Sequence, residues 1–204
     1  MRGINSIINF DNFINCIHHS DIVEIDLPFV QQENSIRYFV NICDIGFGGK
    51  VVRKLNQNRK RFGPRFSYAI STVQTFLTYR KKTISLSSEN LEIRRKSLMI
   101  GICNGPMFGD GLIIQPDANA QDSLLHFAFF SQVSLIDYLL NIRKLWRGFK
   151  INHKEVIYGV DKRFIVTADE EVFGECDGEL FIGKYFTIGI SAYKFPLIIG
   201  CLKN

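Results

Sequence analysis

Alternation of apolar and polar residues dominates the chain and predicts a protein built mainly from β-strands. Residues 21–30, DIVEIDLPFV, alternate as a strand does, and residues 36–49 are expected to form a second strand that runs into a glycine turn. Further short strand-like segments, separated by turn residues, lie at 83–88, 96–104, 111–116, 124–131, 154–160, 163–168, 171–178, 179–183, 185–191 and 195–201. Many short strands between turns are typical of an antiparallel sandwich or barrel-like sheet.

Helical spacing of apolar residues occurs in a few segments only. Gly63-Pro64 is expected to open a helix that ends near Tyr79. A second helix over 134–147 should begin with a capping box formed by Ser134 and Asp137 and end at Gly148. Residues 11–19 are expected to form a short helix. The chain is therefore predicted to be mainly β (α+β), an antiparallel β-sandwich with a few helices.

Size and charge agree with one fair-sized domain that meets an anionic partner. The 204 residues are 46% hydrophobic, and they carry a formal net charge of +5, which permits such a partner without requiring one. The most basic stretch, residues 50–65, is either a solvated face or a contact with an anionic membrane surface, and the second reading is favoured. Because Phe62 is its only aromatic residue and it shows no recognisable nucleic-acid-binding motif, no nucleic-acid partner is expected.

Cysteine usage and the absence of targeting signals favour a cytoplasmic protein, at most peripheral to the inner face of the membrane. The five cysteines form no C-x-x-C pair and are expected to be buried free thiols. The doublet His18-His19 has no acid-rich ligand set beside it, so no transition-metal site is expected. The N-terminus shows no signal-peptide pattern, and the apolar stretch FPLIIGCL is far too short to span a bilayer.

Two acids flank a glycine at Asp177-Gly178-Glu179, between strand-like segments. Asp-Gly is a common hairpin turn, so one interpretation is a turn with a solvated acid beside it. The other is a general base held at the tip of a rigid hairpin. The residues of the turn alone favour the first interpretation.

Together with two further stretches, this turn resembles the C-terminal half of the diacylglycerol kinase-like lipid kinase family, which includes bacterial diacylglycerol kinases and the sphingosine kinases. The family pattern is F-x-N-x-x-x-x-G-F, then a G-N-G run ending in P-x-A-x-x-x-D-G-x-L, then D-G-E. The matching residues are Phe39, Asn41, Gly46, Phe47, Asn104, Gly105, Gly109, Gly111, Pro116, Ala118, Asp122, Leu124, Asp177, Gly178 and Glu179. Each motif is weak alone, but their order and spacing agree over most of the chain.

The resemblance implies roles for particular residues. Glu179 would be the general base that takes the proton of a lipid hydroxyl as it attacks the γ-phosphate of ATP, the co-substrate. A structural Mg²⁺ would be held by Asp122 with the backbone carbonyls of Asn119 and Leu124. The fold would be the C-terminal domain of the lipid kinase and NAD kinase-like fold, with a diacylglycerol-like lipid as substrate.

Two departures from the family pattern concern its loops. Ser123 stands where the family has the glycine after the aspartate, which puts the metal loop in doubt if the position requires a positive φ. Asp110 replaces a glycine of the glycine-rich run.

The G-G-D-G-T and G-T-G-N-D segments that bind ATP in the family do not occur in the 204 residues. Residues 1–20 are therefore expected to be the remnant of a linker from a missing nucleotide-binding domain, and 21–204 the substrate-side sandwich, inactive alone. The alternative is a non-catalytic lipid- or partner-binding module that pairs with a separate nucleotide-binding chain or with itself. An NAD kinase is less favoured, because D-G-E and the P-x-A-x-x-x-D loop match the lipid branch.

Overall fold

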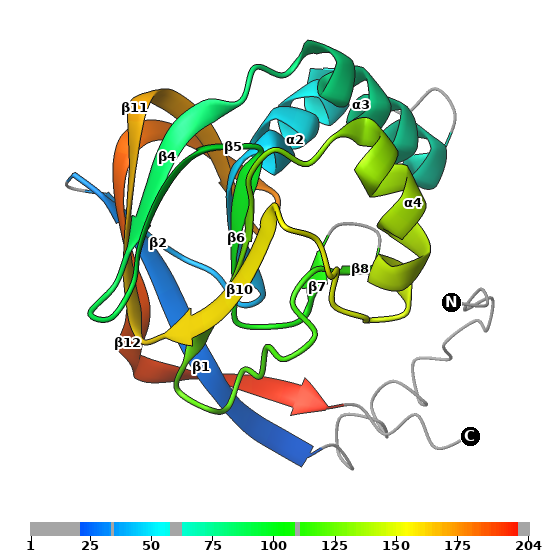
Figure 1. Cartoon of the computed structure of the whole chain (residues 1–204). Helices are drawn as coiled ribbons and strands as arrows, with labels where there is room; N and C mark the ends of the chain where they lie inside the picture. Colours follow the sequence, from blue (N-terminus) through cyan, green and yellow to red (C-terminus); the bar gives the residue numbers. More distant parts are fainter. Residues whose placement is uncertain (1–20, 34, 58–62, 109–110, 200–204) are drawn as a thin grey trace, which may run out of the picture.

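The computed structural model describes residues 21–33, 35–57, 63–108 and 111–199, so the expected helix at 11–19 lies outside them. Strands account for most of the regular structure (Figure 1). They are β1 (Asp21–Gln32), β2 (Ser35–Tyr38), β3 (Ile42–Gly46), β4 (Lys82–Ser87), β5 (Glu92–Ser97), β6 (Met99–Cys103), β7 (Met107–Phe108), β8 (Leu112–Ile113), β9 (Leu125–Phe130), β10 (Val156–Asp161), β11 (Arg163–Cys176) and β12 (Glu179–Ile199). The helices are α2 (Phe47–Gln57), α3 (Pro64–Thr78) and α4 (Leu135–Trp146).

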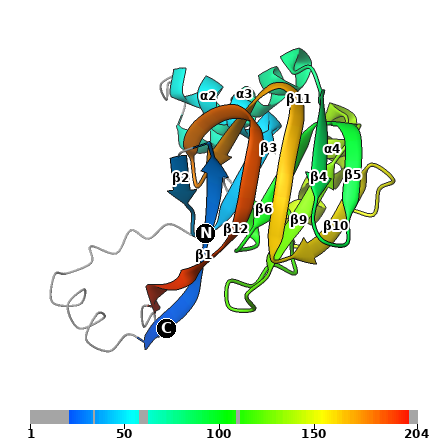
Figure 2. The ribbon, with the colours of Figure 1, turned by 90° about the vertical axis from the view of Figure 1, so that its left-hand side faces the viewer.

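The large sheet is antiparallel and branches at β11. Its strand order is β10-β9-β6-β3-β11-β12-β1-β2, with β4 and β5 joined to it through β11. The first half of β11 pairs with β4 at residues 165–168, and its last part pairs with β3 at residues 174–176. A register shift between Thr167 and Val172 separates the two halves. One long strand thus belongs to both layers of a curved sandwich (Figure 2), which confirms the predicted mainly β fold.

Two apolar cores lie on opposite faces of the strands β3, β6 and β9. The first fills the space between the sheet layers and is rich in phenylalanine, with Phe127, Phe129, Phe164 and Phe186 fully buried. The second lies between the sheet and the helices, around residues such as Phe47. Burial of large aromatic side chains is the dominant stabilising contribution in such cores. The phenylalanine-rich composition therefore reflects the inter-sheet layer.

The region 36–49 differs from the expected single strand. It forms β2, a break, and β3, and helix α2 then begins at Phe47. Gly46 has a φ of +123°, which lets the chain turn from strand to helix. Gly48 and Gly49 lie within α2 because a side chain there would collide with Asp44 and with the backbone of Gly174. Close packing of α2 on the sheet therefore outweighs the low helix propensity of glycine.

The other helices agree with their sequence signals. Helix α3 begins at Pro64 and is capped by Tyr79. Ser134 and Asp137 form the expected reciprocal capping box of α4, and Gly148 follows the helix with a φ of +71°. No helix in the described part of the chain is long and apolar enough to cross a bilayer.

The C-terminal third forms two long strands, and the described cysteines are buried. The five strand-like segments between 163 and 201 merge into β11 and β12. Cys43, Cys103 and Cys176 are buried free thiols, as expected. Cys16 and Cys201 lie outside the described residues.

Candidate functional site

The D-G-E turn is a two-residue hairpin between β11 and β12. Asp177 and Gly178 both have positive φ angles, +48° and +94°, and Cys176 pairs with Glu179 across the turn. Positive φ at both central residues is the signature of the tight hairpin turn whose twist suits an antiparallel pair. The turn residues thus fix where Glu179 begins the next strand.

Asp177 does more than form the turn, because its carboxylate anchors a second segment. It accepts hydrogen bonds from three successive backbone N–H groups, those of Val40 (2.6 Å), Asn41 (3.2 Å) and Ile42 (2.9 Å). Its own N–H donates to the carbonyl of Ile42 at 3.1 Å. Charge-assisted bonds of this kind are among the stronger ones in proteins. The hairpin tip is thereby attached to the start of β3.

Asparagines from the other two motifs converge on the same point. The Asn41 side chain donates to the carbonyl of Met107 at 2.6 Å, and the Asn104 side chain donates to the carbonyls of Val40 and Asp26 at 2.8 and 3.1 Å. A side chain at Gly105 would come within 2.5 Å of the Asn41 amide oxygen. Three motifs that are far apart in sequence therefore form one polar cluster around residues 40–42.

Glu179, the proposed base, is exposed beside this cluster. On the inner side of the hairpin lies a second carboxyl that the sequence analysis missed. Glu175 is buried and accepts a hydrogen bond from the Gly178 N–H at 2.5 Å. Burial, together with the nearby charge of Asp177, raises the pKa of Glu175 to about 7, although the Gly178 hydrogen bond opposes the rise.

Glu175 faces Asp44 across the β11–β3 pair. Asp44 is fully buried, and its Oδ2 accepts the Gly49 N–H of helix α2 at 3.0 Å, while its Oδ1 has no hydrogen-bond partner among the described residues. Burial and the neighbouring Glu175 raise the pKa of Asp44. The sequence gives one sign of this pair: Asp44 is a charged residue within the otherwise apolar run ICDIG.

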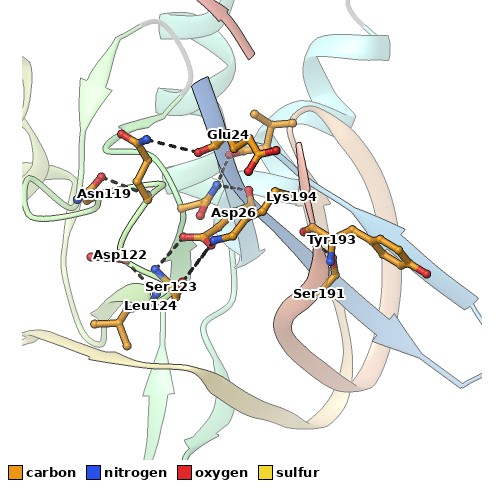
Figure 3. A network of polar contacts seen from close by, with 12 residues as sticks. Glu24, Asp26, Asn119, Asp122, Ser123, Leu124, Ser191, Tyr193 and Lys194 are labelled. Carbon is orange, nitrogen blue, oxygen red and sulfur yellow. Dashed lines mark hydrogen bonds and ion pairs between the residues drawn. The ribbon is translucent and has the colours of Figure 1, made fainter. Parts of the chain in front are cut away.

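The expected magnesium ligands lie on the loop before β9 (Figure 3). The two carboxylate oxygens of Asp122 face the Leu124 N–H and the His126 ring, each at 2.9 Å. The Asn119 carbonyl accepts the Asp122 N–H at 3.4 Å. In the described part of the chain, no three His, Cys, Asp or Glu side chains cluster as metal ligands do.

Ser123 has a φ of +59°, so the position does take the conformation that glycine adopts most easily. Its N–H donates to the Oδ2 of the buried Asp26 at 2.9 Å, and its hydroxyl lies 3.3 Å from the Lys194 ammonium group. Lys194 also forms an ion pair with Asp26 (Figure 3). Leu124 and His126 already contact the two oxygens of Asp122 and a lysine charge lies beside the same turn, so a magnesium ion would have to share Asp122 with these groups. The magnesium site stays a prediction.

An apolar cavity of about 60 Å³ lies between the helices and the sheet. Its walls are mostly apolar and aromatic side chains of α3, α4 and the sheet, among them Phe76, Phe108, Phe130, Tyr138 and Leu145. Phe108 directly follows Met107, whose carbonyl is bound by Asn41. A short run of contacts thus connects the cavity wall to the residues that hold the D-G-E hairpin.

The chain is similar to known proteins over most of its length. Residues 41–186 match the model of the YegS C-terminal NAD kinase beta sandwich-like domain. A "Probable lipid kinase YegS-like" of Klebsiella pneumoniae (strain 342) is 29% identical over 166 residues, 81% of this chain and 54% of that protein. Its counterpart in Yersinia pseudotuberculosis serotype I (strain IP32953) is 27% identical over 188 residues, 92% of this chain and 61% of that protein.

Solved structures show the same fold. One Bacillus anthracis str. Sterne structure described as a diacylglycerol kinase matches with a TM-score of 0.53 and 11% identity, covering 85% of this chain and 53% of that one. Another from the same strain, titled "Crystal structure of a putative diacylglycerol kinase", matches with a TM-score of 0.61 and 15% identity, covering 84% of this chain and 54% of that one. The chain spans little more than half the length of the relatives it matches. With 146 of its 204 residues matched (41 through 186), it belongs to the family of YegS C-terminal, NAD kinase β-sandwich-like domains.

Proposed function

We propose that this chain is the substrate-side part of a lipid kinase and that Glu179 is its general base. The observation that carries the proposal is the anchored hairpin. Three N–H bonds to Asp177 fix the turn, and Glu179 is left exposed at the strand that starts from it. The names of the relatives, lipid kinases in both cases, support the same reaction class.

The chemistry needs a positioned hydroxyl more than covalent help from the protein. In the proposed step the lipid hydroxyl oxygen attacks the γ-phosphorus of ATP, its proton passes to the Glu179 carboxylate, and ADP leaves. ATP enters with its own magnesium ion as substrate. Since no glycine-rich phosphate loop occurs in the 204 residues, we propose that a nucleotide-binding unit on another segment or chain holds the ATP.

The apolar cavity between α3, α4 and the sheet supports a lipid rather than a polar substrate. Its lining is almost free of charge, and its wall at Phe108 connects through Met107 and Asn41 to the hairpin. We propose that it accepts part of an acyl chain, which would direct the lipid headgroup to the D-G-E turn. A diacylglycerol-like lipid is the proposed substrate.

The experiment compares Glu179→Gln with Glu171→Gln, an exposed glutamate of β11 whose loss should be neutral. Transfer of labelled γ-phosphate to diacylglycerol in mixed micelles is measured with the nucleotide-binding half of a relative supplied. Loss of a general base lowers the rate about 10²–10⁴-fold, so Glu179→Gln should lose transfer while Glu171→Gln keeps it. Equal transfer by both variants would refute the assignment of the base.

A non-catalytic lipid-binding module is the second candidate, favoured by the lack of a phosphate loop in the sequence. It predicts that a diacylglycerol bearing a photoreactive group binds the chain and labels the cavity residues on irradiation. It also predicts that no added nucleotide-binding unit restores phosphoryl transfer. Labelling without restored transfer would favour this candidate over the kinase.

A further inference from the structure

The outer face of helix α4 carries large apolar side chains that no other described element covers. Ile136, Leu139 and Leu140 are 68%, 53% and 74% exposed. Their spacing places them on one side of the helix. Tyr138 and Leu145, on the other side, line the apolar cavity. The helix is therefore apolar on both sides, and it lies at the edge of the molecule (Figure 1).

The second half of α4 and the turn after it add aromatic and basic side chains. Trp146 and Phe149 are 57% and 59% exposed. Four cationic residues lie in the same eight-residue stretch and are all exposed: Arg143, Lys144, Arg147 and Lys150. Residues 136–150 contain one acidic residue, Asp137, which lines the cavity and accepts hydrogen bonds from Ser134. Across the fold, Lys150 pairs with Asp117. Within the described part of the chain, the other three cations form no ion pair with an acidic side chain.

We propose that this face, residues 136–150, docks on the surface of an anionic lipid bilayer. Aliphatic side chains followed by Trp, Phe and several cations are the composition of helices that lie in the membrane interface. Interfaces between proteins are instead depleted of lysine at their centres. The positive net charge of the chain complements an anionic bilayer.

This proposal rests on the proposed function, a lipid substrate. It adds the surface through which the chain would reach that lipid in the membrane. Because the inner side of α4 lines the cavity, docking of its outer side brings the cavity next to the acyl chains. The helix would thus form a wall between the bilayer and the cavity.

The basic run 50–65 is the membrane contact that the sequence pattern favours. Part of that run is engaged within the protein. Lys50 and Arg53 lie over the ring of Phe173, 4.9 and 4.8 Å from its centre, and Lys54 donates to Thr78. Residues 58–62 lie outside the described part of the chain. The described residues therefore favour α4 as the docking surface.

Trp146 supplies the test, because it is the only tryptophan of the chain. Its fluorescence is recorded with vesicles of phosphatidylcholine alone and of phosphatidylcholine with phosphatidylglycerol, without ATP. A blue shift with the anionic vesicles, quenching by lipids brominated near the headgroup, and co-flotation are expected. No shift and no flotation would overturn the proposal.

Two pairs of variants test the apolar and the cationic residues separately. Leu139→Gln/Leu140→Gln should abolish flotation, whereas the control Ile36→Gln/Val160→Gln changes exposed residues on the sheet and should not. Arg143→Gln/Arg147→Gln should weaken binding to anionic vesicles about 30-fold, because each variant position removes the binding free energy of roughly one cation at an anionic surface. Its control, Lys162→Gln/Lys184→Gln, removes the same charge from two exposed positions, one between β10 and β11 and one in β12.

Equal losses in a variant and its control would overturn the proposal, since the effect would then be unspecific. A second copy of the chain covering α4 would give a concentration-dependent blue shift without vesicles and a dimer by light scattering, and it would also overturn the proposal. Vesicle binding without phosphoryl transfer would refute the kinase assignment alone and would support the docking proposal.

Discussion

A single carboxylate, that of Asp177, holds the candidate site together. It satisfies the N–H groups of residues 40–42 and shapes the turn before Glu179. From the sequence, Asp-Gly indicated a hairpin turn and no further contact. The motif letters do not say which backbone groups a side chain reaches, since those partners lie more than 130 residues away.

Replacing Asp177 by Ala should lower the free energy of unfolding by about 1–3 kcal/mol, because the partly buried Ile42 N–H is left unsatisfied and the exposed Val40 and Asn41 N–H groups lose a charged acceptor. Urea unfolding followed by far-ultraviolet circular dichroism measures the change. Asp161→Ala is the matched control, since Asp161 bonds only the neighbouring Lys162 N–H at an exposed position. A loss no larger than that of the control would contradict the anchoring role.

The loop at Ser123 shows what the resemblance could and could not predict. The missing glycine raised the question of a positive φ at this position, and Ser123 does adopt a φ of +59°. The contacts of Ser123 with Asp26 and Lys194 were not foreseen. Lys194 lies 71 residues further along the chain, and no periodicity in the sequence connects it to the loop.

At the scale of elements, short sequence patterns predicted those strands and helix ends that depend on neighbouring residues only. Strand β1, the start of α3 and the capping box of α4 follow from patterns within a few residues. Helix α2 does not, because its glycines are explained by the strands β3 and β11 packed against it. Likewise, the merging of short segments into β11 and β12 depends on pairing with distant strands.

The buried carboxyls Glu175 and Asp44 connect three elements, β11, β3 and α2, and should make stability depend on pH. The pKa of Glu175 is raised in the folded state to about 7 from 4.5. The folded chain thus holds more protons than the unfolded chain between these values, and stability falls as pH rises through them. The stability contributed by Glu175 is highest below its unfolded-state pKa. The raised pKa of Asp44 acts in the same direction.

Urea unfolding at several pH values from 5 to 8 measures this slope, which approaches about 1.4 kcal/mol per pH unit for one group. Glu175→Gln should flatten the slope and stabilise the chain at pH 8, because the amide oxygen can still accept the Gly178 N–H. Glu171→Gln, on the exposed part of β11, should leave the slope unchanged. An unaltered slope in Glu175→Gln would show that the carboxyl is not the source.

The whole molecule separates a polar site from an apolar one. The hairpin and its asparagines lie where β3, β11 and the segment after β6 meet, whereas the cavity lies under the helices. Asn41 and Met107 are the contact between the two regions. Under the proposed function, substrate binding and phosphoryl transfer should therefore respond to different substitutions.

Val133→Phe tests that separation, because Val133 is buried and lines the cavity. The added ring atoms would occupy the space proposed for the acyl chain, at a cost in stability of about 1–3 kcal/mol for overpacking. Binding of a fluorescent diacylglycerol should fall at least tenfold, while Glu179→Gln should bind it as the wild type does. Circular dichroism must first show that Val133→Phe is folded, and Val160→Phe, on an exposed strand position, controls for the added ring. If Val133→Phe binds the lipid unchanged, the acyl chain lies elsewhere, and the hairpin would have to be supplied with its substrate from another face of the molecule.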